Sequence, residues 1–333
     1  MARKVKDSIA RIEELIATSD RKFRKTFLDM VKLMRAEISL TRLTRLLEQG
    51  RIDQALGLLE AAANKLGVTW NQSFTSAGFS TAEHINRHVP IIDFDFDQTN
   101  FGAVEAMRRN RLRLIRGFTD QQRLATRQAL ASGIERGLNP RDQARLFRDS
   151  IGLTPYQERI VRNYRQNLEE GDSRALEREL RDARFDGAAR RAVAGEKLPK
   201  AQIDKMVERY RERMVALRAE TIARTESLRS VHEGVQNTYD QAIEDGVLQE
   251  NQLKRTWNTA SDSRVRDSHR PMDGQEKALR EPFVTGNGAR LMYPTDPNGP
   301  AEDTINCRCV VAVTMDLETF DVGGGVSIDI QGV

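Results

Sequence analysis

The sequence has only two cysteines, four histidines and 6% aromatic residues, and it has no apolar run near the ~20 residues that a membrane-spanning helix needs. Its first residues, 1–7, are charged throughout and lack the apolar stretch of a secretory signal or an N-terminal anchor. Cys307 and Cys309 are separated by one residue, which excludes a framework of disulfides and indicates metal binding or simple burial. We therefore expect a cytoplasmic protein with no membrane partner.

The short motifs of common enzymes are also missing. The sequence has no Gly-rich phosphate loop ending in Gly-Lys-Ser or Gly-Lys-Thr, no Gly-x-Ser-x-Gly elbow and no His-Glu-x-x-His pair. Asp93, Asp95 and Asp97 have the initial spacing of a calcium loop, but Gln98 and Val104 stand where that loop needs Gly and Glu. We expect no ATPase or protease activity, and no enzyme.

Charge is abundant, since 31% of the 333 residues are charged and the formal net charge is +4. With 39% hydrophobic residues, this composition indicates a folded, helix-rich chain with much polar surface. Arginine carries most of the positive charge, and one run has no acidic residue within it: Arg108, Arg109, Arg111, Arg113 and Arg116. Such a run suits salt-sensitive contact with the phosphates of double-stranded DNA, although a solvated helix face is the simpler interpretation.

Helical periodicity organises the first two thirds of the chain. Apolar residues at helical spacing predict helical hairpins in residues 1–68 and a central helical region over 101–200. Within the central region, Asn139-Pro140 and Thr154-Pro155 each combine an N-cap residue with proline at the first helical position, so each predicts the start of a helix.

Between these regions, residues 69–100 are rich in Ser, Thr, Gly and Asn, which predicts an irregular or extended connection. Inside it, residues 90–97 alternate apolar and acidic side chains. Strict alternation predicts a strand or extended arm with Phe94 and Phe96 on one face and the aspartates on the other.

A second apolar stripe runs from Ile203 to Ile243 with a stride of three or four residues, which predicts one long amphipathic helix or two collinear ones. After Gly246, glycine, proline and asparagine become dense, and residues 254–259 and 309–313 have the composition of strands. We infer a small α+β module there.

The expected fold is therefore mainly α with a small C-terminal α+β domain. The expected domain layout is N-terminal helical hairpins at 1–68, an irregular or extended connection at 69–100, a central helical region at 101–200, a long helix with the α+β module at 201–316, and a Gly-rich tail at 317–333.

An ordered set of polar and aromatic motifs occupies the C-terminal module: Arg218–Glu226, Trp257–His269, Met272–Gly274, Tyr293–Pro297 and Asn306–Cys309. In this order and spacing, the set resembles the phage head morphogenesis family typified by the minor head protein of phage Mu. The resemblance covers roughly residues 215–315. The helical segment from about residue 150 also resembles the region that precedes this module in many members.

This resemblance implies a minor head or minor capsid protein, a structural virion component that acts in capsid assembly at the portal vertex. Its partners would be the portal protein and other head proteins, with multiple copies at the vertex. Some members accompany the DNA during genome ejection, and assembly takes place in the host cytoplasm. The motif residues would have structural roles: Arg224, Glu226, Trp257, Asp262, Arg264, Arg266, Gly274 and Asn306.

The charged motif residues offer several ion pairs that would pin a small fold. Arg224 and Glu220 lie one helical turn apart and can pair. Glu226 leaves a second carboxylate for Arg264 or Arg266.

His269, Cys307 and Cys309 offer three soft or borderline metal ligands, and Asp262, Asp267 or His232 is a candidate fourth. Zinc is the natural ion for such a set. The spacing differs from that of a zinc finger, so a structural role without metal also stays open.

Two other functions compete with an assembly role. His269, Asn306 and the cysteine pair suggest a metal-dependent nuclease of the His-Asn-His type, but no histidine follows His269, so the second histidine is missing. Non-specific DNA binding is the other alternative, because the sequence contains basic side chains but no recognition motif that reads bases.

Overall fold

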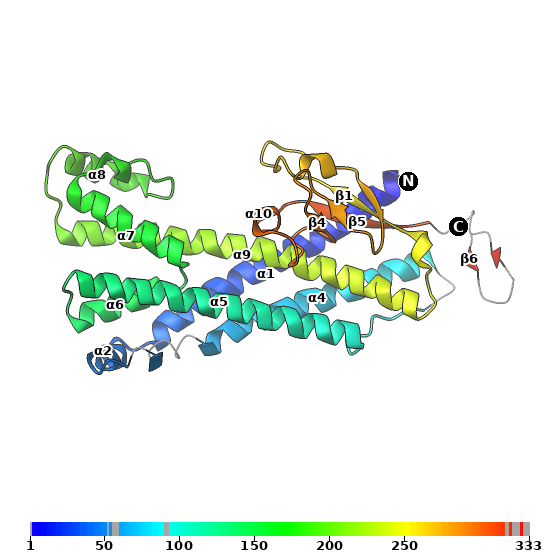
Figure 1. The fold of residues 1–333 in the computed structure, drawn as a ribbon, viewed down its shortest axis with the longest axis horizontal. Helices are drawn as coiled ribbons and strands as arrows, with labels where there is room; N and C mark the ends of the chain where they lie inside the picture. The colour runs from blue at the N-terminus through cyan, green and yellow to red at the C-terminus, as the bar shows by residue number, and fades with distance from the viewer. Residues whose placement is uncertain are drawn as a thin grey trace. The chain divides into compact units, whose positions relative to one another are not determined.

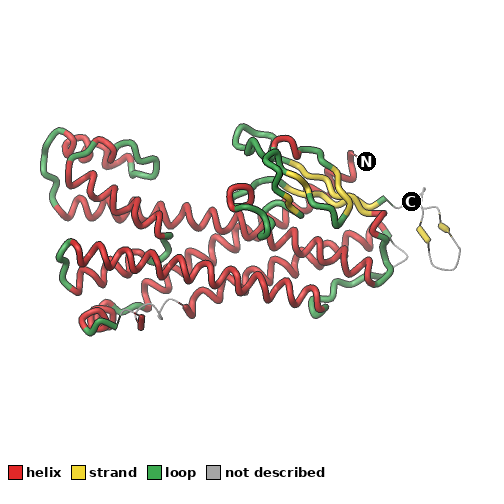
Figure 2. The backbone as a smooth tube through the Cα atoms, in the orientation of Figure 1, coloured by secondary structure: helices red, strands yellow, loops and turns green. Residues whose placement is uncertain are grey.

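The computed structural model describes residues 2–51, 53–54, 60–89, 93–316, 320–321 and 327–328. They form two compact units, each assembled from segments that are distant in the sequence. The first unit draws on residues 1–23, 69–110 and 221–333, and the second on 24–68 and 111–220. Helices dominate, and strands occur only in the C-terminal part of what is described, which confirms the expected fold class (Figures 1 and 2). The predicted domain boundaries stay a prediction.

The helices are labelled in Figure 1. The α-helices are α1 (Ala2–Glu37), α2 (Leu40–Glu48), α4 (Glu60–His88), α5 (Phe101–Glu135), α6 (Pro140–Ser150), α7 (Pro155–Glu170), α8 (Asp186–Val193), α9 (Lys200–Glu244) and α10 (Ala301–Thr304). The short 3-10 helices are η1 (Ser173–Ala175), η2 (Ala183–Phe185), η3 (Glu250–Gln252) and η4 (Arg270–Met272).

The main sheet of the first unit has the strand order β2-β1-β5 (Figure 2). Strands β1 (Leu253–Asn258) and β5 (Val310–Met315) pair antiparallel along their whole length, and β2 (Glu276–Ala278) adds to the other edge of β1. Strands β1 and β5 confirm the two strands predicted at residues 254–259 and 309–313. Two short antiparallel pairs complete the strands: β3 (Phe283–Val284) with β4 (Arg290–Leu291), and β6 (Phe320–Asp321) with β7 (Ser327–Ile328).

A small hydrophobic cluster holds this module together. It joins α9, the sheet and the loops through Leu228, Trp257, Met272, Phe283, Leu291, Cys307, Cys309 and Val311. The Trp257 and Phe283 rings meet edge to face with their centroids 5.3 Å apart. Full burial of one such side chain contributes roughly 1.5–3 kcal/mol.

In the second unit, the predicted helix starts are confirmed by their caps. The Asn139 side chain accepts a hydrogen bond from the backbone N–H of Asp142 at the start of α6. At the start of α7, Thr154 and Gln157 form a reciprocal capping box. Gly171 ends α7 in the left-handed conformation, with φ 71°. Each cap satisfies backbone groups that the helix itself leaves unpaired.

The irregular connection predicted for residues 69–100 is wrong over its first 20 residues, because α4 is a helix as far as His88. Its buried face is carried by Trp70, Phe74, Ala77, Thr81 and Ile85, at a helical stride among many Ser and Thr residues. Because the segment is rich in polar residues, its buried helical face could not be recognised from the sequence. Tertiary packing decides the conformation here, against local preference.

The small side chains of α4 allow close packing within the first unit. A Cβ at Gly78 would lie 2.5 Å from the Phe96 ring, and a Cβ at Gly234 of α9 would lie 2.4 Å from the carbonyl oxygen of Phe74. Helix α9, which confirms the predicted long helix, therefore needs glycine where it approaches α4.

The expected extended arm is confirmed over the described residues 93–97, where Phe94 and Phe96 are buried and the aspartates are exposed. It is held by side chains and belongs to none of the described strands. Asn86 exchanges hydrogen bonds with the backbone N–H and C=O of Phe94, at 3.0 and 2.9 Å. Gln241 does the same for Asp97.

The segment 1–68, expected to form helical hairpins, is helical over most of its described residues. Helix α1 runs unbroken for 36 residues, because no glycine or proline interrupts residues 2–37. The nine-residue helix α2 follows after Ile38 and Ser39. Residues 52 and 55–59 of the predicted hairpins, residues 90–92 of the predicted arm and most of the Gly-rich tail lie outside the described residues.

None of the described helices combines the length and apolar character that crossing a membrane requires.

Candidate functional site

The three predicted metal ligands come together in the first unit. His269 directly precedes η4, while Cys307 and Cys309 lie between α10 and β5. All three side chains are buried, with exposed fractions of 1%, 1% and 3%. The fold therefore brings residues about 40 positions apart in the sequence into one cluster.

Both sulfur atoms approach the same ring nitrogen. Cys307 Sγ lies 3.6 Å and Cys309 Sγ 3.5 Å from His269 Nδ1. The three ligand atoms all lie within 4.8 Å of one another, and no other group of three or more candidate ligands occurs among the described residues. These side chains can hold a metal ion.

The surroundings of the two thiols shift their pKa values in opposite directions. The hydrogen bond with Cys309 lowers the pKa of Cys307 well below its usual value. The same hydrogen bond, together with burial, raises the pKa of Cys309. One thiolate is therefore favoured in the pair, and thiolate is the form that binds metals.

Asp303 was missed by the sequence analysis. Its Oδ1 lies 3.6 Å from His269 Nε2, and its side chain is only 2% exposed. Ser268 Oγ donates to the same oxygen at 2.7 Å. The other carboxylate oxygen and His269 Nε2 are buried without a hydrogen-bond partner. Nothing in its local sequence distinguishes Asp303, because its position depends on how α10 folds against His269.

The three predicted candidates for a fourth ligand are wrong. Asp262 accepts two hydrogen bonds from Arg308. Asp267 is 94% exposed and lies beside Arg270. His232 is buried and fully engaged with the backbone: its Nδ1 donates to Leu228 O at 2.7 Å, and its Nε2 accepts from Val311 N at 3.1 Å. Each group already has another partner, which the sequence alone does not reveal.

A cleft of about 220 Å³ opens beside the cluster. His269 and both cysteines line it, and so do four arginines: Arg224, Arg264, Arg266 and Arg308. The arginines come from α9, from the loop after β1 and from the Asn306–Cys309 motif. Their combined charge gives the cleft a strong preference for anions.

Most of these arginines are positioned by hydrogen bonds. Arg224 Nη1 donates to Asn306 Oδ1 at 2.8 Å, and Arg266 donates to the carbonyl of Ile305. Arg308 donates twice to Asp262, at 2.6 Å each. This pairing holds the pKa of Asp262 far below its usual range. Arg264 is 78% exposed and lies 3.6 Å from Asp262.

The ion pairs predicted for α9 are also wrong. In the second unit, Glu220 pairs with Arg24 at 2.9 Å. In the first unit, Glu226 pairs with Arg229 at 2.8 Å, and both side chains are buried. The Arg229 Nε also donates to Thr295 O. Glu226 and Arg229 are three residues apart on α9, whereas Glu220 pairs with an arginine of α1, which helix spacing cannot indicate.

The remaining motif residues shape the backbone around the cluster. Asn306 has a left-handed φ of 60°, and its N–H donates to Thr225 Oγ1 at 3.0 Å. Gly274 has φ 75°, and its N–H donates to the carbonyl of Trp257 at 2.8 Å. Left-handed conformations suit asparagine and glycine best.

Arg255 is a second polar anchor that the sequence analysis missed. It is 1% exposed, lies over the Phe283 ring, and donates to the carbonyls of Ala278, Met292 and Glu281. Burial lowers its pKa to about 10, so it stays charged at neutral pH. Nothing in the sequence of β1 indicated that Arg255 would be a buried anchor.

The predicted basic run is only partly available for DNA. Arg108 donates twice to Glu105, and Arg109 lies 3.7 Å from Glu233. In the second unit, Arg111 donates to Asn64, Arg113 is half-buried and Arg116 is exposed. The run is therefore not one uninterrupted free surface.

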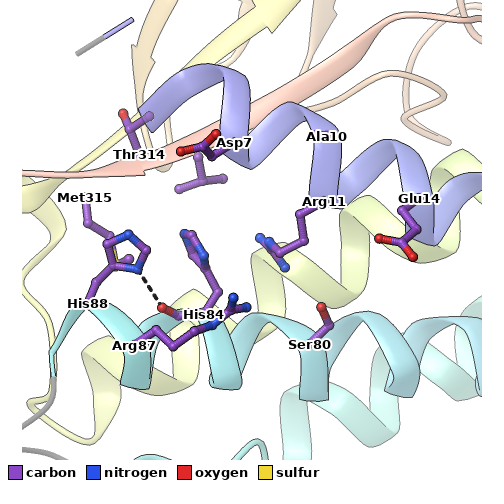
Figure 3. Close-up of a pocket in the computed structure, with 11 residues that line it drawn as sticks. Asp7, Ala10, Arg11, Glu14, Ser80, His84, Arg87, His88, Thr314 and Met315 are labelled. Carbon is purple, nitrogen blue, oxygen red and sulfur yellow. Dashed lines mark hydrogen bonds between the residues drawn. The ribbon is translucent and has the colours of Figure 1, made fainter. Parts of the chain in front are cut away.

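A larger pocket of about 540 Å³ lies elsewhere in the first unit, between α1, α4 and β5 (Figure 3). Arg11 and Arg87 line it, but so do Asp7 and Glu14, and burial lowers the pKa of His84 to about 3, leaving that ring neutral. The fixed charges balance, so the pocket selects no ligand by charge.

These features define a mainly helical protein that carries a small α+β module fixed by buried polar contacts. Residues 158–312 match the family described as "Phage Mu protein F like protein". This match supports a protein of the phage Mu F-like head morphogenesis family. The family points to a phage head morphogenesis protein and a virion component.

One curated relative is the NAD(+)--arginine ADP-ribosyltransferase EFV of Enterococcus faecalis, which is 32% identical over 98 residues. The match covers 28% of this chain and 18% of that protein. No solved structure matches the chain.

Proposed function

We propose that this protein is a minor head protein that acts at the portal vertex during capsid assembly, with the portal protein and other head proteins as partners. The single observation that carries this proposal is the family match, which spans most of α7, all of α8 and α9, and nearly the whole α+β module. Multiple copies at the vertex are part of the proposal.

The contacts of the module support a structural role over an enzymatic one. Glu226 and Asp262 are committed to arginine partners, and Arg224 is committed to Asn306. Groups that act on a substrate need to be free to reach it. A module fixed in this way presents a defined surface to a protein partner.

Contact with double-stranded DNA, during packaging or ejection, is a secondary part of the proposal. The exposed arginines Arg116 and Arg264 support it. Because phosphate contacts release bound counterions, the affinity should fall steeply as salt rises. We expect the purified chain to retain duplex DNA at low salt and to lose it at high salt. Retention that does not change with salt would rule out contact through phosphates.

The decisive experiment determines where the chain lies in the phage particle. We expect a cryo-EM reconstruction of phage heads without imposed icosahedral symmetry to show its density at the portal vertex alone. Particles made without this chain should assemble or package DNA poorly, and complementation with the intact gene should restore them. Density spread over the whole shell, or mature particles that lack the protein, would overturn the proposal.

An activity assay tests the nuclease alternative. We expect purified protein with magnesium to leave supercoiled plasmid intact. Nicking that disappears in the His269→Ala variant and persists in the His232→Gln variant would favour an enzyme.

A further inference from the structure

We propose that His269, Cys307 and Cys309 bind one zinc ion through His269 Nδ1 and the two sulfur atoms, and that the fourth coordination position faces the arginine-lined cleft. This inference is independent of the proposed role at the portal vertex.

The two nitrogen–sulfur distances match those that a tetrahedral zinc ion would set. Tetrahedral zinc has Zn–S bonds of about 2.3 Å and Zn–N bonds of about 2.0–2.1 Å, which sets each nitrogen about 3.6 Å from each sulfur. The two nitrogen–sulfur distances here are 3.6 and 3.5 Å. Two cysteine sulfurs and one imidazole form a donor set that favours zinc over magnesium or calcium.

Hydrogen bonding alone explains the cluster less well. One ring nitrogen carries either one hydrogen or one lone pair, so it serves one thiol well, whereas two sulfurs converge on His269 Nδ1. A shared metal ion accounts for the convergence of all three ligand atoms.

Asp303 completes the arrangement from the other side of the ring. If Nδ1 binds the metal, the proton stays on Nε2, which lies 3.6 Å from the Asp303 carboxylate. A histidine ligand commonly donates its second N–H to a carboxylate, which fixes the ring and strengthens the ligand. In the structure His269 Nε2 is buried and has no hydrogen-bond partner, so we expect the Asp303 carboxylate to move closer and accept its proton when the metal binds.

The fourth position has no protein ligand among the described residues, since the cluster contains three candidate side chains only. The cleft is lined by all three ligands, so it gives access to the metal. Arg264 and Arg266 line the same cleft. We expect a water molecule there that an oxygen anion can replace, with the arginines holding the anion.

Elemental analysis of the purified full-length chain tests the metal. We expect about one zinc per chain in the wild type, and loss of zinc in Cys307→Ser and His269→Ala. His232→Gln is the matched control, because His232 is a buried histidine bonded to backbone, and this variant should keep its zinc. Wild-type protein that is folded, zinc-free and unable to take up added zinc would overturn the proposal.

A milder variant separates metal binding from folding. Asp303→Asn keeps all three ligands, and we expect it to remain folded while its zinc affinity falls 10- to 100-fold, in competition with a colorimetric chelator. An affinity equal to that of the wild type would contradict the arrangement of Asp303 and His269.

Cobalt-substituted protein tests the open position. We expect the visible absorption bands of Co²⁺ to change on titration with inorganic phosphate, and to respond at several-fold higher phosphate in Arg264→Ala and Arg266→Ala. Arg270→Ala, outside the cleft lining, is the control. If the Co²⁺ absorption bands do not change as phosphate is added, the fourth coordination position is closed and that part of the proposal is refuted.

Discussion

Replacing Arg255 by methionine tests whether buried polar contacts, more than the apolar core, hold the α+β module together. Methionine keeps much of the length and apolar contact of the side chain but removes its charge and every hydrogen bond. In the structure these bonds end on three carbonyl groups, those of Ala278, Met292 and Glu281. The variant leaves these acceptors without their donor.

The size of the effect follows from two opposing contributions. Hydrogen bonds from a charged donor contribute about 2 kcal/mol each, so three acceptors together lose about 6 kcal/mol. Burial lowers the Arg255 pKa from 12.5 to about 10. At about 1.4 kcal/mol per pKa unit, removing the buried charge returns about 3 kcal/mol. We therefore expect Arg255→Met to lower the free energy of unfolding by about 3 kcal/mol.

Urea unfolding followed by tryptophan fluorescence measures this change, since Trp257 is buried in the module. The matched control is Arg264→Met, where the side chain is 78% exposed, and we expect a change within about 0.5 kcal/mol. If both variants unfold at the same urea concentration as the wild type, the module does not depend on its buried arginine and the reasoning fails.

Two further predictions concern a buried carboxyl and a helix contact. Burial raises the pKa of Glu158 from its usual 4.5 to about 7, so the folded state binds an extra proton and loses stability as pH rises from about 4.5 to 7. Glu158→Gln should remove up to about 3 kcal/mol of this pH dependence, measured by urea titrations across pH. An unchanged pH profile would refute this prediction. Gly234→Ala should lower the free energy of unfolding by about 1–3 kcal/mol, because its Cβ would meet a backbone oxygen. The control is Gly117→Ala on α5, where a Cβ meets nothing, and this variant should be neutral or stabilising. Equal thermal midpoints for the two variants would contradict the packing argument.

Local signals made part of the fold predictable. The helices α6 and α7 start at Asn139 and Thr154, where an N-cap and a proline stand together, because capping depends on residues within one turn. Helix α4 was not predictable in this way. Its stripe of buried residues is interrupted by serine, threonine and glycine, which favour turns locally but permit close helix packing in the folded unit.

Some residues of the candidate site could be predicted from the sequence, and others depend on the tertiary structure. His269, Cys307 and Cys309 could be selected from the sequence because their side-chain chemistry is scarce in this chain, with four histidines and two cysteines in all. Asp303 and Arg255 could not, because aspartate and arginine are common and only the tertiary structure selects one of each. The ion pairs of α9 were mispredicted for the same reason, since arginine is common and only the tertiary structure selects Arg24 for Glu220 and Arg229 for Glu226.

The distribution of regular structure explains why this module needs such anchors. Between His269 and Cys307 the chain has only the short elements η4, β2, β3, β4 and α10, of which none exceeds four residues. So little regular hydrogen bonding cannot fix a segment of this length, and small domains with limited cores commonly depend on metals or other cross-links. The proposed zinc would join the two ends of this segment, and Arg255 binds the carbonyls of its middle. Loss of zinc should therefore expose the amides of residues 270–306 to hydrogen exchange, while those of α6 and α7 keep their protection.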